Sequence, residues 1–250
     1  MRTFLVMFIV ILMAGNYTDG LAYFEEYPPY EFKNGPPKHL EAETLVDHGS
    51  KNDYKSEDGN VEARLMATDT SLDFLVKEGG YVLTRKNVQE LPFPVGAVYW
   101  ADLEGNGLKD FIIFYWWQAP GIMFPLCRVE IFLKKEAGGY RKIYYDTLSP
   151  GLEDFADLDN DGKYEVIITD ICERGRHNYY SYSIYEFKDY KLVNADDKFK
   201  GFPKFIWYTH KANDKDTKHL TREERLLHTK EKDAMIWYEN ITKTGMPYRD

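Results

Sequence analysis

The sequence predicts a mainly β domain with a C-terminal helix. Aromatic residues make up 16% of the 250-residue chain, including 20 Tyr and 15 Phe, and aromatic and β-branched residues favour strands. Short apolar runs alternate with Gly, Pro and Asp turn signals between residues 97 and 205, and a helical pattern begins only after residue 220. Short strands separated by turn signals at regular spacing are typical of a sandwich, a barrel or a propeller.

Eight strand-like segments make up the region with the strongest β pattern. They span residues 97–101, 111–117, 128–133, 140–145, 154–156, 165–171, 181–187 and 190–193. The turn signal at 136–139, which contains two glycines, predicts a hairpin between two of these segments, and Lys188-Asp189 predicts another. A weaker pattern predicts a further strand pair within residues 72–82, around Gly79-Gly80.

The N-terminus has the pattern of an export signal. Arg2 precedes an apolar run over residues 4–14, and the small residues Gly20 and Ala22 then mark a cleavage site. The run is too short to span a bilayer, which takes about 20 apolar residues. We therefore expect a signal peptide at 1–22, a mature chain that begins at Tyr23 without a stable membrane span, and a secreted, periplasmic or cell-surface location.

The segments on either side of the β region have different patterns. Residues 23–95 begin rich in Pro, Gly, Glu and Tyr, which predicts an extended arm followed by the weak β segment. Residues 206–250 predict a loop and then a helix that starts with a capping box at 221–224. The apolar side chains that follow at helical spacing are expected to pack on the β domain. They are Leu227, Ala234, Tyr238 and Ile241.

Charge and cysteine content limit the partners and the chemistry. The net charge of −9 argues against nucleic acid as a partner, because binding to phosphates requires a basic surface. Cys127 and Cys172 could form one disulfide in an oxidising compartment, or they could be two buried thiols. Neither has a neighbouring pair of histidines, so a zinc site is not expected.

A repeated acidic loop provides the candidate site. Residues 156–168 read ADLDNDGKYEVII, and residues 101–113 read ADLEGNGLKDFII. In both copies, oxygen-bearing side chains stand at loop positions 1, 3, 5 and 9, Gly stands at position 6, and an apolar strand and a hairpin follow. A repeating unit of several strands is typical of propeller blades and related arrays.

This spacing suits Ca²⁺, which prefers six to eight oxygen ligands, and Gly at position 6 allows the turn that brings the position-7 carbonyl to the ion. The expected ligands of the second loop are Asp157, Asp159, Asp161, the carbonyl of Lys163, and Glu165. Those of the first loop are Asp102, Glu104, Asn106, the carbonyl of Leu108, and Asp110. The first loop has side-chain charge −3 against −4 in the second, so it should bind more weakly. The alternative for each loop is an acidic surface turn without an ion.

An EF-hand is excluded because its loop requires Glu at position 12, where this chain has Ile168. The loops resemble instead the FG-GAP repeat, also called the VCBS-type or integrin-α-like repeat, whose pattern is Asp-x-Asp-x-Asp-Gly-x-x-Asp followed by an apolar strand. This resemblance implies calcium bound between strands of a β-propeller blade. A full propeller of that family has about seven blades, more than this chain can supply. We therefore expect a partial or compact propeller-like repeat domain over residues 96–205.

Three classes of function remain open. The resemblance favours an exported calcium-binding module that binds or adheres to a protein or glycan. The second is a structural subunit of an extracellular or cell-surface assembly, in which the N-terminal arm and the helix contact neighbouring chains. The third is a secreted hydrolase with a site that the sequence does not reveal. We rank an enzyme below the other two, because the chain contains none of the motifs of nucleophile elbows, metalloproteases or phosphate loops, and we name no catalytic residue.

Overall fold

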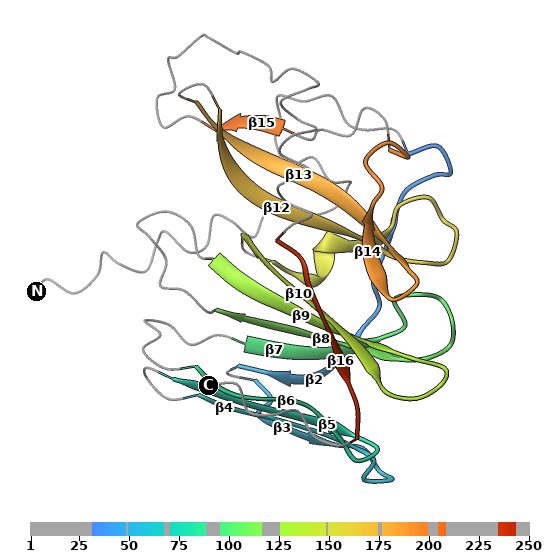
Figure 1. Ribbon diagram of the computed structural model, residues 1–250, viewed down its shortest axis with the longest axis vertical. Coiled ribbons are helices and arrows are strands. Elements are labelled where there is room, and N and C mark those ends of the chain that lie inside the picture. Colours follow the sequence, from blue (N-terminus) through green and yellow to red (C-terminus); the bar gives the residue numbers. More distant parts are fainter. Residues whose placement is uncertain are drawn as a thin grey trace, which may run out of the picture.

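The protein is described by a computed structural model, whose described residues are 32–48, 50–67, 71–88, 96–116, 126–148, 150–174, 177–199, 205–208 and 235–243. Within these residues the chain forms three antiparallel sheets, which we call sheets A, B and C. They stack in the order A, B, C (Figure 1). The mainly β class is therefore confirmed. In the described part the three sheets do not close into a propeller.

Sheet A consists of β1 (Lys38–His39), β11 (Phe155–Asp157), β12 (Glu165–Arg174), β13 (His177–Lys188), β14 (Lys191–Asn194) and β15 (Phe205–Tyr208). Sheet B consists of β2 (Glu43–Asp47), β7 (Gly96–Ala101), β8 (Asp110–Trp116), β9 (Leu126–Lys134), β10 (Tyr140–Leu148) and β16 (Trp237–Ile241). Sheet C consists of β3 (Asp53–Lys55), β4 (Val61–Ala67), β5 (Leu72–Glu78) and β6 (Tyr81–Val88). A 3₁₀ turn, η2 (Leu152–Asp154), precedes β11.

Each sheet contains four strands that follow one another in sequence and pair with their neighbours: β3–β6, β7–β10 and β11–β14. The eight predicted strands and the predicted pair around Gly79-Gly80 are all confirmed. In the hairpin between β13 and β14, Asp189 and Tyr190 both have positive φ, as a tight two-residue turn requires. Because strands alternate in direction, the β7–β8 and β9–β10 connections lie at the same end of sheet B.

The N-terminal segment differs from the expected arm. Its three short strands each join a different sheet: β1 pairs with β11, β2 with β7, and β3 with β4. The segment from 38 to 55 thus runs across the edges of all three sheets (Figure 1). Strands of two to five residues at sheet edges depend on their partners and carry little periodicity of their own, so their sequence resembles that of a loop.

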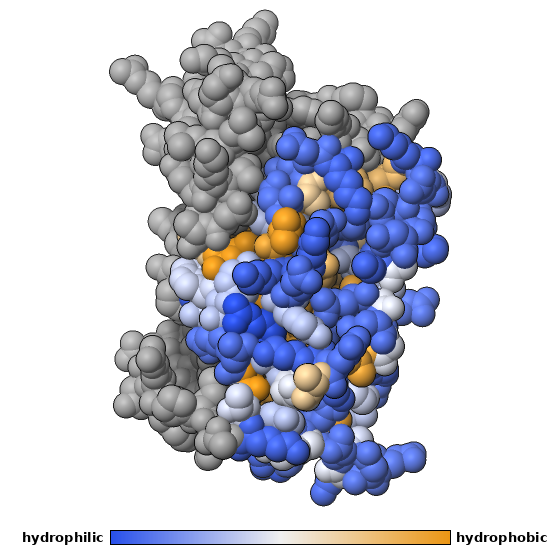
Figure 2. Space-filling model, turned by 45° about the vertical axis from the view of Figure 1, so that its right-hand side comes forward, coloured by the Kyte–Doolittle hydropathy of each residue, from blue (hydrophilic) through white to orange (hydrophobic). Residues whose placement is uncertain are grey.

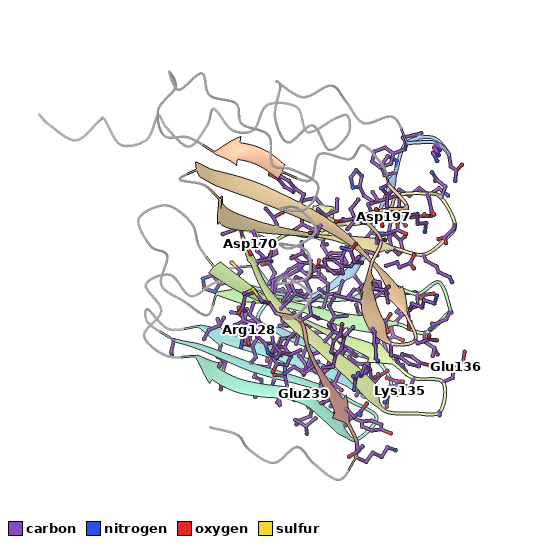
Figure 3. The ribbon with its side chains drawn as sticks, turned by 45° about the horizontal axis from the view of Figure 1, so that its top comes forward. Arg128, Lys135, Glu136, Asp170, Asp197 and Glu239 are labelled. Atoms are coloured by element: carbon purple, nitrogen blue, oxygen red, sulfur yellow. The ribbon has the colours of Figure 1, made fainter. Side chains whose placement is uncertain are left out.

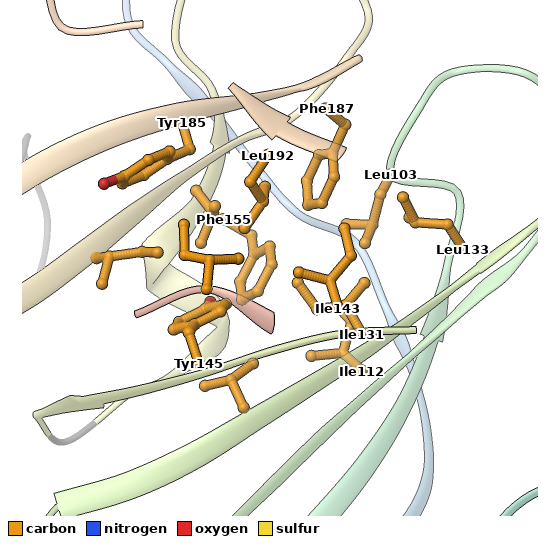
Figure 4. Packing of buried hydrophobic residues seen from close by; sticks show 14 of the residues in the cluster. Leu103, Ile112, Ile131, Leu133, Ile143, Tyr145, Phe155, Tyr185, Phe187 and Leu192 are labelled. Atoms are coloured by element: carbon orange, nitrogen blue, oxygen red, sulfur yellow. The ribbon is translucent and has the colours of Figure 1, made fainter. Parts of the chain in front are cut away.

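Apolar side chains fill both spaces between the sheets. Sheets A and B enclose one cluster, which includes Ile131, Ile143, Phe155 and Tyr185 (Figure 4). Sheets B and C enclose a second cluster, to which β5 contributes the alternating residues Leu72, Phe74 and Val76. A third, smaller cluster lies on the other face of sheet A, so β12 is apolar on both faces.

The prediction of a C-terminal helix is wrong for its last residues. Tyr238 and Ile241 belong to β16, which pairs with β10, and Ile241 is 1% exposed in the cluster between sheets B and C. Positions three apart fit one face of a helix, but pairing with β10 gave this segment backbone partners that the sequence pattern does not reveal. The start of the predicted helix, with the capping box, Leu227 and Ala234, lies outside the described residues.

Two other predictions fall wholly or partly outside the described part. The signal peptide and its cleavage site precede residue 32. Cys127 is buried in β9, but the side chain of Cys172 is not described, so the disulfide stays a prediction. Among the described residues, no helix is long and apolar enough to cross a membrane.

Candidate metal centre

The second acidic loop connects β11 to β12, and its own side chains fold it. Asp157 accepts hydrogen bonds from the backbone N–H groups of Asp161 and Gly162, both at 3.0 Å. Asp161 accepts one from the N–H of Lys163 at 2.9 Å. Gly162 has φ 88°, a conformation that suits glycine. These hydrogen bonds fold the loop into a tight turn that leads directly into β12.

Three carboxylates of this loop meet at a common centre. Asp157, Asp159 and Glu165 each offer an oxygen, and the three oxygens lie within 4.8 Å of one another. Asp157 and Glu165 are each 2% exposed. Glu165 is held by the N–H of Leu158 at 2.8 Å, on one of its two oxygens. Asp161 is exposed and lies outside this group, so the structure brings together three of the four predicted carboxylates. The fifth predicted ligand, the backbone carbonyl of Lys163, stays a prediction.

Two further charged residues take part that the sequence analysis missed. Lys198 reaches the centre from the segment after β14, and its Nζ lies 2.7 Å from Asp159 Oδ2 and 3.4 Å from Glu165 Oε1. The same Nζ lies 3.4 Å from Glu186 Oε2, on β13. Glu186 pairs directly with Glu165 across the sheet, so the β12–β13 register is the signal that could have found it. No local pattern points to Lys198.

The electrostatics of the centre reflect crowded, partly desolvated acids. Burial, together with the charge of Asp159, raises the pKa of Glu165 to about 7, despite the opposing effects of the Leu158 N–H and Lys198. Burial opposes the charged form of Lys198, but its contacts with Asp159, Glu165 and Glu186 outweigh that effect and raise its pKa. Asp159 Oδ1 is buried and accepts no hydrogen bond from the described residues. An oxygen cluster that already attracts a cation and retains an unused buried acceptor fits a divalent ion.

The first acidic loop, between β7 and β8, has the same backbone design. Asp102 accepts hydrogen bonds from the N–H groups of Asn106 and Gly107, at 3.1 and 2.7 Å. Asn106 accepts one from the N–H of Leu108 at 2.8 Å, and Asp110 accepts one from the N–H of Leu103 at 3.0 Å. Each of these bonds has its counterpart at the same position of the second loop. The strands also pair in the same register, since Ala101 lies opposite Asp110 as Ala156 lies opposite Glu165.

The first loop nevertheless does not gather its carboxylates. Asp110 is fully buried, and its second oxygen accepts the N–H of Lys134 at 2.8 Å, so both of its oxygens are held by backbone. Burial raises its pKa to about 8, against the opposing effect of these two bonds. Burial and the charge of Asp102 also raise the pKa of Glu104, whose Oε2 lies 3.5 Å from the amide Nδ2 of Asn106. Within the described residues, the first loop contributes no group of three metal-ligating side chains.

The two loops are in direct contact. The N–H of Tyr164 donates to the carbonyl of Leu103 at 3.1 Å. Gly105, with φ 64°, approaches the second loop so closely that a Cβ there would lie 2.5 Å from the carbonyl oxygen of Gly162. The two loops therefore form one paired structure at the strand ends of two adjacent sheets.

The loops lie on a hydrophilic side of the molecule, which we call the loop rim and define as residues 102–110, 135–139, 157–165 and 188–198. Figure 2 shows mostly hydrophilic residues on the face turned toward the viewer. Lys135, Glu136 and Asp197 lie along the same side in Figure 3. A cavity of ≈ 230 Å³ opens beside the centre, lined among others by Glu165, Glu186 and Lys198.

Comparisons with known proteins do not assign the chain to a family: no family model, curated protein or solved structure matches it. The interpretation of the site therefore depends on its own geometry and on the sequence pattern.

Proposed function

We propose that the protein is an exported calcium-binding β-repeat scaffold that acts as a binding or adhesion module for a protein or glycan. The observation that carries the proposal is the convergence of Asp157, Asp159 and Glu165 within 4.8 Å. We expect the side chain of Asp161 and the carbonyl of Lys163 to supply further oxygens from the same loop when the ion is bound. An all-oxygen set of this kind suits Ca²⁺ or Mg²⁺ and does not suit zinc or copper, which prefer nitrogen and sulfur ligands.

Calcium is favoured over magnesium by the number and the flexibility of the ligands. Mg²⁺ requires near-ideal octahedral geometry and usually keeps several waters, whereas Ca²⁺ accepts six to eight oxygens in irregular arrangements. The loop combines carboxylates on a short turn with one carboxylate from the start of a strand, an irregular set. When bound, the ion would neutralise the acids and hold the second loop in one conformation, a structural role.

The arrangement of the sheets supports the interpretation of the fold as a propeller-like repeat domain. Three consecutive four-stranded units stack face to face, and two of them carry the acidic loop between their first and second strands. In such an arrangement, the loops at one end of every blade form a continuous surface. We propose that the loop rim is the surface that meets a partner and that calcium keeps it rigid.

A thermal-stability experiment tests the calcium site. Millimolar CaCl₂ should raise the melting temperature of the chelator-treated protein, because a ligand bound only by the folded state contributes about 2.7 kcal/mol at a hundredfold excess over its Kd. Asp159→Asn with Asp161→Asn should abolish the rise. Asp189→Asn with Asp197→Asn removes the same charge from two exposed acids of the loop rim that lie outside the triad, and serves as the matched control. An equal rise in both double variants would contradict the proposal, and an equal response to MgCl₂ would contradict the choice of ion.

A further inference from the structure

Lys198 contacts two of the three carboxylates that a calcium ion would use. Its Nζ lies 2.7 Å from Asp159 Oδ2 and 3.4 Å from Glu165 Oε1. A calcium ion bound to either oxygen would lie about 2.3–2.6 Å from it. Two cations that share one carboxylate at these distances repel each other, and the repulsion is stronger in a partly buried site than in water. Both cations cannot hold these oxygens at once without a large electrostatic cost.

The backbone of Lys198 is held in place on both sides. Ala195 donates its N–H to the carbonyl of Ile184 at 2.8 Å, and Lys198 donates its N–H to the carbonyl of Ala195 at 2.9 Å. Asp196 accepts the N–H of Ile184 at 2.9 Å, and Phe199 is 4% exposed in the cluster on the outer face of sheet A. Because its backbone is fixed, the Lys198 ammonium stays near the three carboxylates at a high effective concentration.

The side chain of Lys198 can leave the centre without unfolding its turn. It is 37% exposed, and its third carboxylate contact, to Glu186 Oε2 at 3.4 Å, lies outside the triad. Glu186 and the adjoining cavity thus offer the displaced ammonium a charged partner and space. Rotamer changes of such side chains are fast, so the exchange needs no large conformational change.

We propose that Lys198 is a tethered counter-cation that stabilises the calcium-free centre and that calcium must displace. This inference rests on the proposed calcium function. A site whose competent form is only fractionally populated binds its ligand more weakly by that fraction. The competition would therefore raise the calcium concentration at which the centre fills, toward the range of about 10⁻⁴–10⁻³ M that is typical of extracellular modules.

Calcium titration of the full chain by calorimetry tests this inference with three variants. Lys198→Met removes the ammonium and keeps a side chain of similar length, so calcium should bind about tenfold more tightly than to the parent protein. Lys198→Arg keeps the charge and should change the affinity much less. Lys188→Met removes the same charge from an exposed residue that lines the same cavity, and it should change the affinity by no more than about twofold.

Melting without calcium gives a second readout. Lys198→Met should melt at a lower temperature than the parent in chelator, because its acids have lost their counter-ion, and this deficit should vanish in saturating calcium. Should Lys198→Met fail to fold, Lys198→Gln makes the same test with a polar side chain.

The outcomes separate this inference from the proposed function. Unchanged or weaker calcium binding by Lys198→Met would overturn the role of Lys198 while leaving the calcium site intact. A similar gain in affinity in Lys188→Met would also overturn it, because general charge would then explain the effect. Failure of the parent and of Lys198→Met alike to bind calcium would overturn the proposed function itself. Binding that appears only once Lys198 is removed would support both.

Discussion

The two acidic loops have the same pattern of hydrogen bonds to the backbone and differ in the partners of their ninth residue. In both, the first Asp accepts two backbone N–H groups and the ninth residue accepts one, at matching positions. In the first loop the ninth residue is Asp110, and backbone N–H groups bind both of its oxygens. In the second loop it is Glu165, one methylene longer, whose Oε1 lies near Lys198.

The strand opposite the ninth residue reinforces this difference. Glu186 lies opposite Glu165, whereas the register that pairs Phe111 with Phe132 puts Leu133 opposite Asp110. Leu133 is fully buried. The comparison teaches that turn chemistry alone can form this loop, and that the carboxylate oxygens available to a cation are those left over once the backbone N–H groups are satisfied.

The largest expected effect comes from removing the ninth residue. Asp110→Ala would leave the buried N–H of Leu103 and the part-buried N–H of Lys134 without their partner, each at a cost of about 1–3 kcal/mol, so the free energy of unfolding should fall by about 2–6 kcal/mol. Glu165→Ala would leave one such group and would relieve repulsion among the acids, so its cost in chelator should be clearly smaller. Urea denaturation with and without calcium measures both. If both variants lose the same unfolding free energy in chelator, Asp110 and Glu165 do not differ in how far their carboxylates are occupied by backbone N–H groups.

A smaller effect should follow from disturbing the contact between the loops. Gly105→Ala places a Cβ against the Gly162 carbonyl and strains a positive φ, whereas Gly107→Ala, at φ 80°, meets nothing within 4 Å and only strains φ. We expect the second change to cost about 1–2 kcal/mol and the first about 1–3 kcal/mol more, the usual range for overpacking. Gly105→Ala should also weaken calcium binding to the second loop. Identical losses of stability would show that the loops do not depend on each other.

The smallest expected effect is a pH dependence specific to the second loop. Because a metal ligand must be deprotonated and the pKa of Glu165 is about 7 without metal, calcium affinity should fall as the pH drops through 7. Between pH 8 and pH 6 the fall should be about tenfold, since one proton must then be displaced. An ordinary exposed carboxylate would lose affinity only near pH 4.5. Calorimetry at both pH values measures the fall, Glu165→Gln should flatten it, and constant affinity in the parent would contradict this role for Glu165.

Sequence reasoning succeeded where structure is local. Alternating apolar residues and turn signals located the strands from β5 to β14, because burial on one face imposes a period of two. The loops at 102–110 and 157–165 were also found, since their folding relies on hydrogen bonds within nine residues. The reasoning failed for Tyr238 and Ile241, whose conformation depends on pairing with β10, distant in sequence.

The acidic loop, its spacing and its repetition were determined by the sequence alone, because each Asp, Asn and Gly acts on its immediate neighbours. The charges of the two copies ranked the first loop as the weaker candidate, but only the tertiary structure decided which copy gathers three carboxylates. Lys198, from the segment after β14, contacts two carboxylates of the second loop, and Glu186 lies opposite Glu165 in sheet A. In sheet B the N–H of Lys134 occupies the second oxygen of Asp110. The physical reason is that a carboxylate's availability depends on every donor within hydrogen-bonding distance, and the donors that distinguish the two loops, Lys134 and Lys198, come from parts of the chain that the local pattern does not specify.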